Sequence, residues 1–69
     1  MPINLSEPEK EVVIKKIGGS PEVRKHLETL GFTVGEKVSL VSILSGSVII
    51  KVKESRIAVG EELARKIMV

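Results

Sequence analysis

The stretch that most constrains the fold of this chain is LETLGFTVGEKV, residues 27–38, with glycines at positions 31 and 35. Apolar residues at helical spacing come before Gly31, and an alternating apolar pattern comes after Gly35. Glycine readily adopts the positive φ that ends many helices and that a type II turn requires. The stretch therefore predicts a helix that stops at Gly31, a tight turn with Val34 and Gly35 at its centre, and then a strand. Phe32 is expected to fold back onto the helix.

The sequence also predicts where that helix begins. Ser20 is a suitable N-cap, Pro21 fits the first helical position, and Glu22 places an acid in the first turn. Val23, Leu27 and Leu30 form one narrow apolar stripe at helical spacing, which predicts a helix with a single buried side. The solvent side carries two pairs at i,i+4 spacing, Glu22 with His26 and Arg24 with Glu28.

The rest of the chain predicts short strands joined by tight turns. Alternation and β-branched residues indicate strands at residues 11–17, 37–44, 48–53 and 56–59, with Met68 and Val69 closing the sheet. In residues 37–44 the apolar positions change phase, from Val38 and Leu40 to Val41 and Ile43, which predicts a β-bulge. A short helical turn is expected from Gly60, and Ile3 and Leu5 are expected to tuck against the core.

Composition favours a single small barrel. The 69 residues allow one domain, 1–69, and 42% of them are apolar with Phe32 as the one aromatic residue. A core of Val, Ile and Leu favours strands, and a flat sheet of this size would leave half of these side chains wet. We therefore predict a mainly β fold, a small closed barrel of about five strands, with one α-helix inserted after the first strand and a short C-terminal helical turn.

The residue types present make catalysis improbable. The chain has no Cys, Tyr or Asp and one His, and its serines occupy predicted caps and turns. We predict no catalytic residue and no cofactor. Glu22 and His26 are the one pair that could share a divalent metal ion, and two ligands make only a weak, open site. The absence of a long apolar run and of a signal peptide predicts a cytosolic protein without membrane insertion.

The sequence resembles the FeoA family, small cytosolic companions of the ferrous-iron transporter FeoB. The resemblance runs along nearly the whole chain: Val12–Ile17, Arg24, Leu27, Leu30–Gly31, Gly35, Val38, Leu40–Val41, Gly46, Val48–Ile50, Ile57–Val59, Ala64 and Ile67. Two positions depart from it, Val34 where the family usually has proline and Pro8–Lys10 where it usually has a glycine-containing turn. The resemblance implies an SH3-like barrel with an extra helix, a link to transition metals, and FeoB as partner.

Candidate partner-binding residues are Arg24 and Glu28 on the helix and Leu44 and Ile49 beside the predicted hairpin, with Gly31, Phe32 and Gly35 as structural residues of the turn. Exposed aliphatic side chains beside a hairpin also suggest weak self-association.

Two alternatives stay open: an SH3-like regulatory domain related to the C-terminal domain of diphtheria toxin repressor type regulators, and a small RNA-binding barrel. The net charge of +2 is small and interleaved with glutamates, which disfavours nucleic acid.

Overall fold

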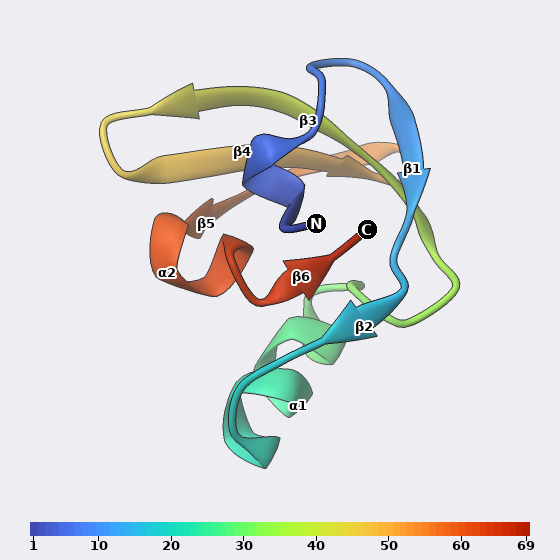
Figure 1. The fold of residues 1–69 in the computed structure, drawn as a ribbon, viewed down its shortest axis with the longest axis vertical. Coiled ribbons are helices and arrows are strands. Elements are labelled where there is room, and N and C mark those ends of the chain that lie inside the picture. The colour runs from blue at the N-terminus through green and yellow to red at the C-terminus, as the bar shows by residue number, and fades with distance from the viewer.

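Two antiparallel sheets enclose the core in the computed structural model, which describes residues 1–69 (Figure 1). One sheet has four strands in the order β1-β3-β4-β5 and the other pairs β2 with β6. The elements are the 3₁₀-helix η1 (Ile3–Leu5), β1 (Glu11–Val13), β2 (Lys16–Ile17), α1 (Pro21–Thr29), β3 (Lys37–Leu44), β4 (Ser47–Val52), β5 (Ser55–Gly60), α2 (Glu61–Ala64) and β6 (Ile67–Met68). The predicted order of elements is confirmed, including the helix inserted after the first strand segment and the short C-terminal helix.

The continuous strand predicted for residues 11–17 is wrong. The chain pairs with β3 through Val13 and then changes partner: the N–H of Ile14 donates to Glu36, and the N–H of Lys15 donates to Met68. This change interrupts the alternation, so Ile14 and Ile17, which the sequence placed on opposite faces, are both buried. The break therefore lets one short segment contribute to both sheets.

The β3–β4 hairpin matches the sequence closely. β3 has the predicted bounds, and the register shifts between Leu40 and Ser42, which makes Val41 the bulged residue. Ser45 and Gly46 form the turn with φ of 34° and 83°, the positive pair typical of a two-residue type I′ hairpin. The next turn lies at Lys53 and Glu54, one residue earlier than the gap between the predicted strands 48–53 and 56–59.

Helix α1 begins and ends as its sequence predicts. The Ser20 hydroxyl accepts from the N–H of Val23, and Pro21 is the first helical residue. At the other end the N–H of Gly31 donates to Glu28 and that of Phe32 donates to Leu27, both at 2.9 Å, which is the hydrogen-bond pattern of a Schellman motif. Gly31 has φ +103°, so the motif depends on a residue that tolerates this angle.

We expect Gly31→Ala to lower the free energy of unfolding by about 1 kcal/mol, because a Cβ is strained at this φ. The substituted Cβ would lie 3.8 Å from the side chain of Val52, so the cost is conformational and not a clash. Gly18→Ala is the matched control, since Gly18 does not have a positive φ and its Cβ would meet only the carbonyl oxygen of Lys66 at 3.8 Å. Thermal denaturation of both variants checks this, and equal melting temperatures would contradict it.

The turn after the helix is also as predicted. The N–H of Glu36 donates to Thr33 at 3.0 Å across Val34 and Gly35, and Gly35 has φ +93°. The N–H of Gly35 donates to Ile14, which ties the turn to the first strand segment at 2.8 Å. This places Val34 at the second position of a type II turn.

Val34→Pro should be neutral or stabilising by up to about 1 kcal/mol, because proline restricts the unfolded chain and fits this turn position. The N–H of Val34 donates no backbone hydrogen bond in a turn or loop, and the side chain is 65% exposed, so the substitution removes little. Denaturant unfolding measures the change. A clear loss of stability would mean that residue 34 does not hold this turn position.

The core is aliphatic apart from Phe32, and it lies between the four-stranded sheet and the elements below it in Figure 1. Ile3 is fully buried, whereas Leu5, which was predicted to join it, is 67% exposed. A 3₁₀-helix has three residues per turn, so side chains two positions apart point in different directions. The buried side chains are Ile3, Ile14, Ile17, Leu27, Phe32, Val38, Leu40, Val48, Ile50, Val52, Val59, Ala64 and Ile67.

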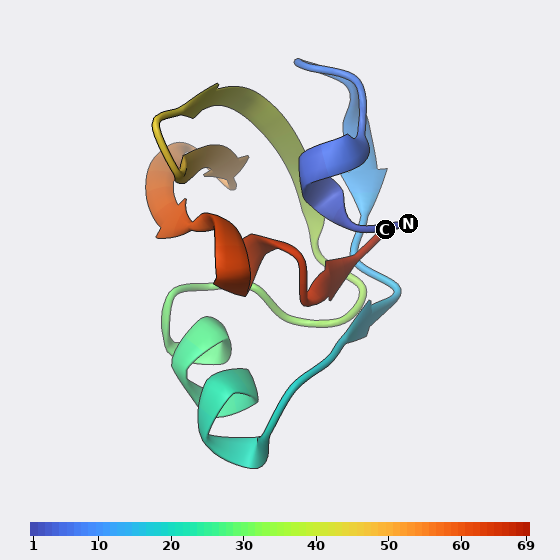
Figure 2. The same cartoon turned by 60° about the vertical axis from the view of Figure 1, so that its left-hand side comes forward.

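The two ends of the chain close the structure. The N–H of Val69 donates to Met1 at 2.7 Å, and Pro2 forms an isolated bridge with Met68. Figure 2 shows the two termini side by side, with α1 on the opposite side of α2 and β6 from the β3–β4 hairpin. The strands and the short α2 thus wrap around one core.

Candidate functional site

The side of the four-stranded sheet that points away from the core carries a patch of aliphatic and basic side chains. Val48, Ile50 and Val52 point inward, so Ile49 and Lys51 point outward from the central strand β4. Their cross-strand partners share that side: Ser42 and Ala58 flank Ile49, and Ser39 and Arg56 flank Lys51. We call this the outer sheet face, made of Ser39, Val41, Ser42, Leu44, Ile49, Lys51, Arg56 and Ala58.

The structure brings together two of the predicted partner-binding residues on this face. Leu44 pairs with Ser47, which makes it a diagonal neighbour of Ile49 on the same side of the sheet. Leu44 is 58% exposed and Ile49 is half-buried. Ile49 lies on a central strand, between β3 and β5, and so contributes to a sheet face and not to a sheet edge.

Arg24 and Glu28 lie elsewhere. They are exposed on α1, which both views place across α2 and β6 from β3 and β4 (Figures 1 and 2). No ion pair joins them, although their spacing would allow one. Arg24 and Glu28 are therefore not part of the outer sheet face.

Two cations on the outer sheet face have no acidic partner. Lys51 and Arg56 are directly opposite each other on β4 and β5, and the two ion pairs of the chain are Lys37 with Glu11 and Arg65 with Glu61. Like charges in this arrangement repel each other. Glu9, Ser39, Val41, Lys51 and Arg56 line a hollow of about 220 Å³ at this point. The sheet therefore presents an electropositive depression beside an aliphatic patch.

Sequence reasoning missed Lys51 and Arg56. The alternation of residues 48–53 is the signal that could have shown that Lys51 points outward. That Arg56 stands directly opposite depends on the register of β4 with β5, which the turn at Lys53 and Glu54 sets. The predicted turn was one residue too late, so the predicted register did not place Arg56 opposite Lys51.

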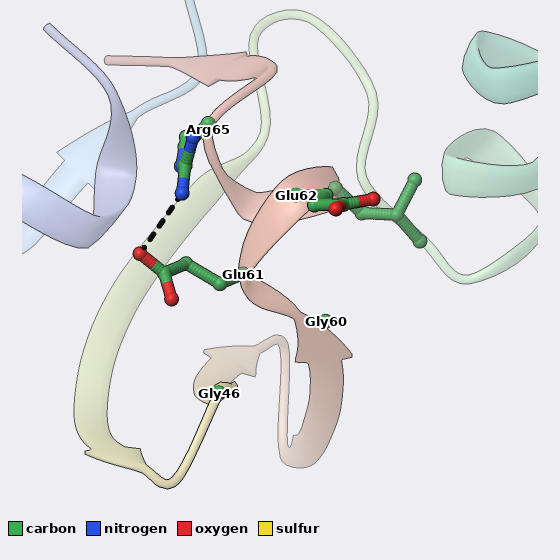
Figure 3. A pocket seen from close by; sticks show the side chains of 6 residues that line it. Gly46, Gly60, Glu61, Glu62 and Arg65 are labelled. Carbon is green, nitrogen blue, oxygen red and sulfur yellow. Dashed lines mark hydrogen bonds and ion pairs between the residues drawn. The ribbon is translucent and has the colours of Figure 1, made fainter.

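A second hollow, of about 530 Å³, lies between the hairpin turn and α2 (Figure 3). Gly46, Gly60, Glu62 and Leu63 line it together with Glu61 and Arg65, whose side chains form an ion pair at 3.2 Å. The N–H of Glu61 donates to the carbonyl of Gly46 at 2.9 Å and ties the hairpin to α2. The one apolar side chain of this hollow is that of Leu63, and two of its charged side chains pair with each other.

Potential metal ligands are dispersed in this fold. Glu22 and His26 are both exposed on α1, and no hydrogen bond or ion pair joins them. No group of three or more His, Cys, Asp or Glu side chains is placed to hold a metal ion. The weak metal site suggested for Glu22 and His26 stays a prediction.

We expect ferrous iron to bind the isolated chain no more tightly than low millimolar, because two protein ligands leave most of the coordination sphere to water. His26→Ala should weaken this binding further, because it removes one of the two ligands. Anaerobic titration calorimetry on both proteins is the measurement. A stoichiometric micromolar site that His26→Ala removes would contradict the expectation.

The surface lacks the aromatic platform of a small RNA-binding barrel. Phe32, the single aromatic residue, is fully buried, so no aromatic ring is available for base stacking. None of the helices has the length and apolar composition needed to cross a lipid bilayer.

A short, strongly bent sheet closed by a two-stranded ribbon, with a single helical turn before the last strand, defines an SH3-like barrel, and α1 is its addition. The crystal structure of an iron uptake regulatory protein, FeoA, matches with a TM-score of 0.89 and 30% identity, covering 100% of this chain and 93% of that one. The solution structure of iron(II) transport protein A from Clostridium thermocellum shares the fold, with a TM-score of 0.86 and 23% identity, covering 97% of this chain and 43% of that one.

The sequence leads to the same family. Residues 1–69 match the FeoA domain family. A candidate Fe(2+) transport protein A of Methanocaldococcus jannaschii is 37% identical over 68 residues, covering 99% of this chain and 83% of the relative. The chain belongs to the FeoA family, and the resemblance stated from its residues is confirmed.

Proposed function

We propose that this chain is a non-enzymatic, cytosolic accessory protein of ferrous-iron transport that binds the cytosolic GTPase region of a FeoB-type membrane transporter. Membership of the FeoA family, which includes a relative named as an Fe(2+) transport protein, supports a role in ferrous-iron transport. The observation that carries the mode of action is the outer sheet face, where Leu44 and Ile49 leave aliphatic surface accessible next to unpaired cations. Exposed aliphatic patches with a charged rim are typical of protein interfaces.

The accessory protein would act by binding one state of the transporter more tightly than another. A ligand shifts a conformational equilibrium only by the difference between its affinities for the two states. Binding that differs between the GDP-bound and GTP-bound forms would therefore couple this chain to the nucleotide cycle. Metal coordination by Glu22 and His26 has no part in this mechanism.

The test is direct binding between this chain and the purified cytosolic region of the FeoB-type transporter of the same organism. Titration calorimetry is performed with GDP, with a non-hydrolysable GTP analogue, and without nucleotide. We expect saturable binding whose affinity depends on the nucleotide. If no nucleotide state supports binding, the chain does not act through this region and the proposal fails.

A further inference from the structure

The outer edge of β5 is open, and it adjoins the outer sheet face. β5 is the last strand of its sheet, with β4 on one side and no strand on the other (Figure 1). An open edge presents backbone N–H and C=O groups that a further strand can pair with. The register determines which residues present them.

The turn at Lys53 and Glu54 is closed by Val52 and Ser55. The residues that close a two-residue hairpin turn exchange hydrogen bonds, and hydrogen-bonded and non-hydrogen-bonded pairs then alternate along the ladder. Arg56 and Ala58 consequently occupy non-hydrogen-bonded positions, and their N–H and C=O groups point away from β4. No turn, loop, cap or side-chain hydrogen bond uses these groups.

The same two residues place their side chains on the outer sheet face. Arg56 is opposite Lys51, and Ala58 is opposite Ile49. A strand added to β5 would lie about 4.8 Å from it, so its side chains on this face would meet Arg56 and Ala58 directly. Backbone pairing and side-chain contacts would therefore be made by one segment.

We propose that the edge of β5 is completed by an extended acidic segment of the protein partner. The segment carries Asp or Glu opposite Arg56 and an apolar residue opposite Ala58, two positions apart along the strand. Its carboxylate neutralises the unpaired cations at Arg56 and Lys51, and its apolar side chain packs on Ala58 and Ile49. This inference rests on the proposed function, since it names the chemistry of the partner at that site.

Charge decides the occupant. Lys51 and Arg56 have no ion-pair partner within the chain, so an incoming carboxylate relieves a repulsion and breaks no existing pair. Glu9 is the one acid that lines the adjoining hollow, and it forms no ion pair. Its carboxylate would repel an acidic segment, which gives the proposal a variant with the opposite sign.

The experiment uses the purified cytosolic region of the FeoB-type transporter, and then overlapping synthetic peptides that cover it, as probes for the intact chain. Arg56→Glu should weaken binding roughly tenfold, and Lys25→Glu, an equal charge change at an exposed position of α1, should leave it unchanged. Glu9→Gln should strengthen binding about twofold. Binding should also weaken as salt is added, because the attraction between exposed charges is screened.

Backbone pairing is tested separately. Ala58→Pro removes the outward N–H, which the ladder with β4 does not use, and should abolish binding, whereas Ala58→Ser should retain it. Because proline could also disturb the fold, amide hydrogen exchange of the unmodified chain provides the second measurement. The amides of Arg56 and Ala58 should exchange rapidly in the free chain and slowly in the complex.

Binding with these amides still unprotected, and insensitive to Arg56→Glu, would overturn the β5 site while leaving the proposed function in place. No binding of the cytosolic region would overturn both. Amides protected in the free chain at high concentration, and unaffected by the partner, would identify a second copy as the occupant and contradict the acidic segment.

Discussion

Phe32→Ala is expected to abolish the folded state at ambient temperature. Phe32 is fully buried, is the largest side chain of the core, and donates one of the two N–H bonds of the Schellman motif that ends α1. Removing a buried phenylalanine side chain costs about 3–5 kcal/mol. A chain of 69 residues has a total free energy of unfolding of about 3–10 kcal/mol. The loss of free energy expected for Phe32→Ala is therefore comparable with this total.

Far-ultraviolet circular dichroism with thermal and denaturant unfolding measures the effect. Phe32→Leu, which keeps most of the volume, should fold with reduced stability. Val34→Ala is the matched control, because Val34 is two residues away and 65% exposed, and it should unfold like the parent. A Phe32→Ala protein with an unchanged melting temperature would mean that this side chain does not hold α1 against the sheet.

Local signals explain why much of the fold could be predicted. The caps of α1 depend on residues within one turn of each end, and Ser20 and Gly31 were enough to place them. The bulge at Val41 was visible as a phase change within a single strand. The break after Val13 could not be predicted from local sequence. It arises because the chain leaves β3 and pairs with β6, which lies at the far end of the sequence.

In the candidate site, too, the features set by local sequence could be predicted, and those set by the packing of distant segments could not. Leu44 and Ile49 were predicted to lie beside the same hairpin, and the register of β3 with β4 makes them neighbours on one face. Arg24 and Glu28 were expected to orient the same partner, but the position of α1 relative to the sheet is set by the packing of the whole core, which local patterns do not contain. The cationic pair at Lys51 and Arg56 required the β4–β5 register and was missed.

Ile49→Lys should reduce binding to the FeoB cytosolic region by about 2 kcal/mol, which is roughly thirtyfold in Kd. Ile49 stands at the centre of the outer sheet face, between Ser42 and Ala58, and it is only half-buried. A lysine there can extend its ammonium group into water, so the fold should be retained. It replaces the central apolar contact with a charge and adds to the cations at Lys51 and Arg56.

The same substitution should weaken self-association, because a second copy would use the aliphatic surface that the partner otherwise covers. Val34→Lys is the matched control: Val34 is 65% exposed in the turn that bonds to Ile14, away from the outer sheet face. It should change neither property. Calorimetry with the cytosolic region and sedimentation equilibrium of the chain alone measure the two effects, with circular dichroism to verify folding. If folded Ile49→Lys binds normally, the outer sheet face is not the interface. The exposed side of α1 then becomes the better candidate, because Arg24 and Glu28 are the remaining predicted partner-binding residues and lie outside this sheet.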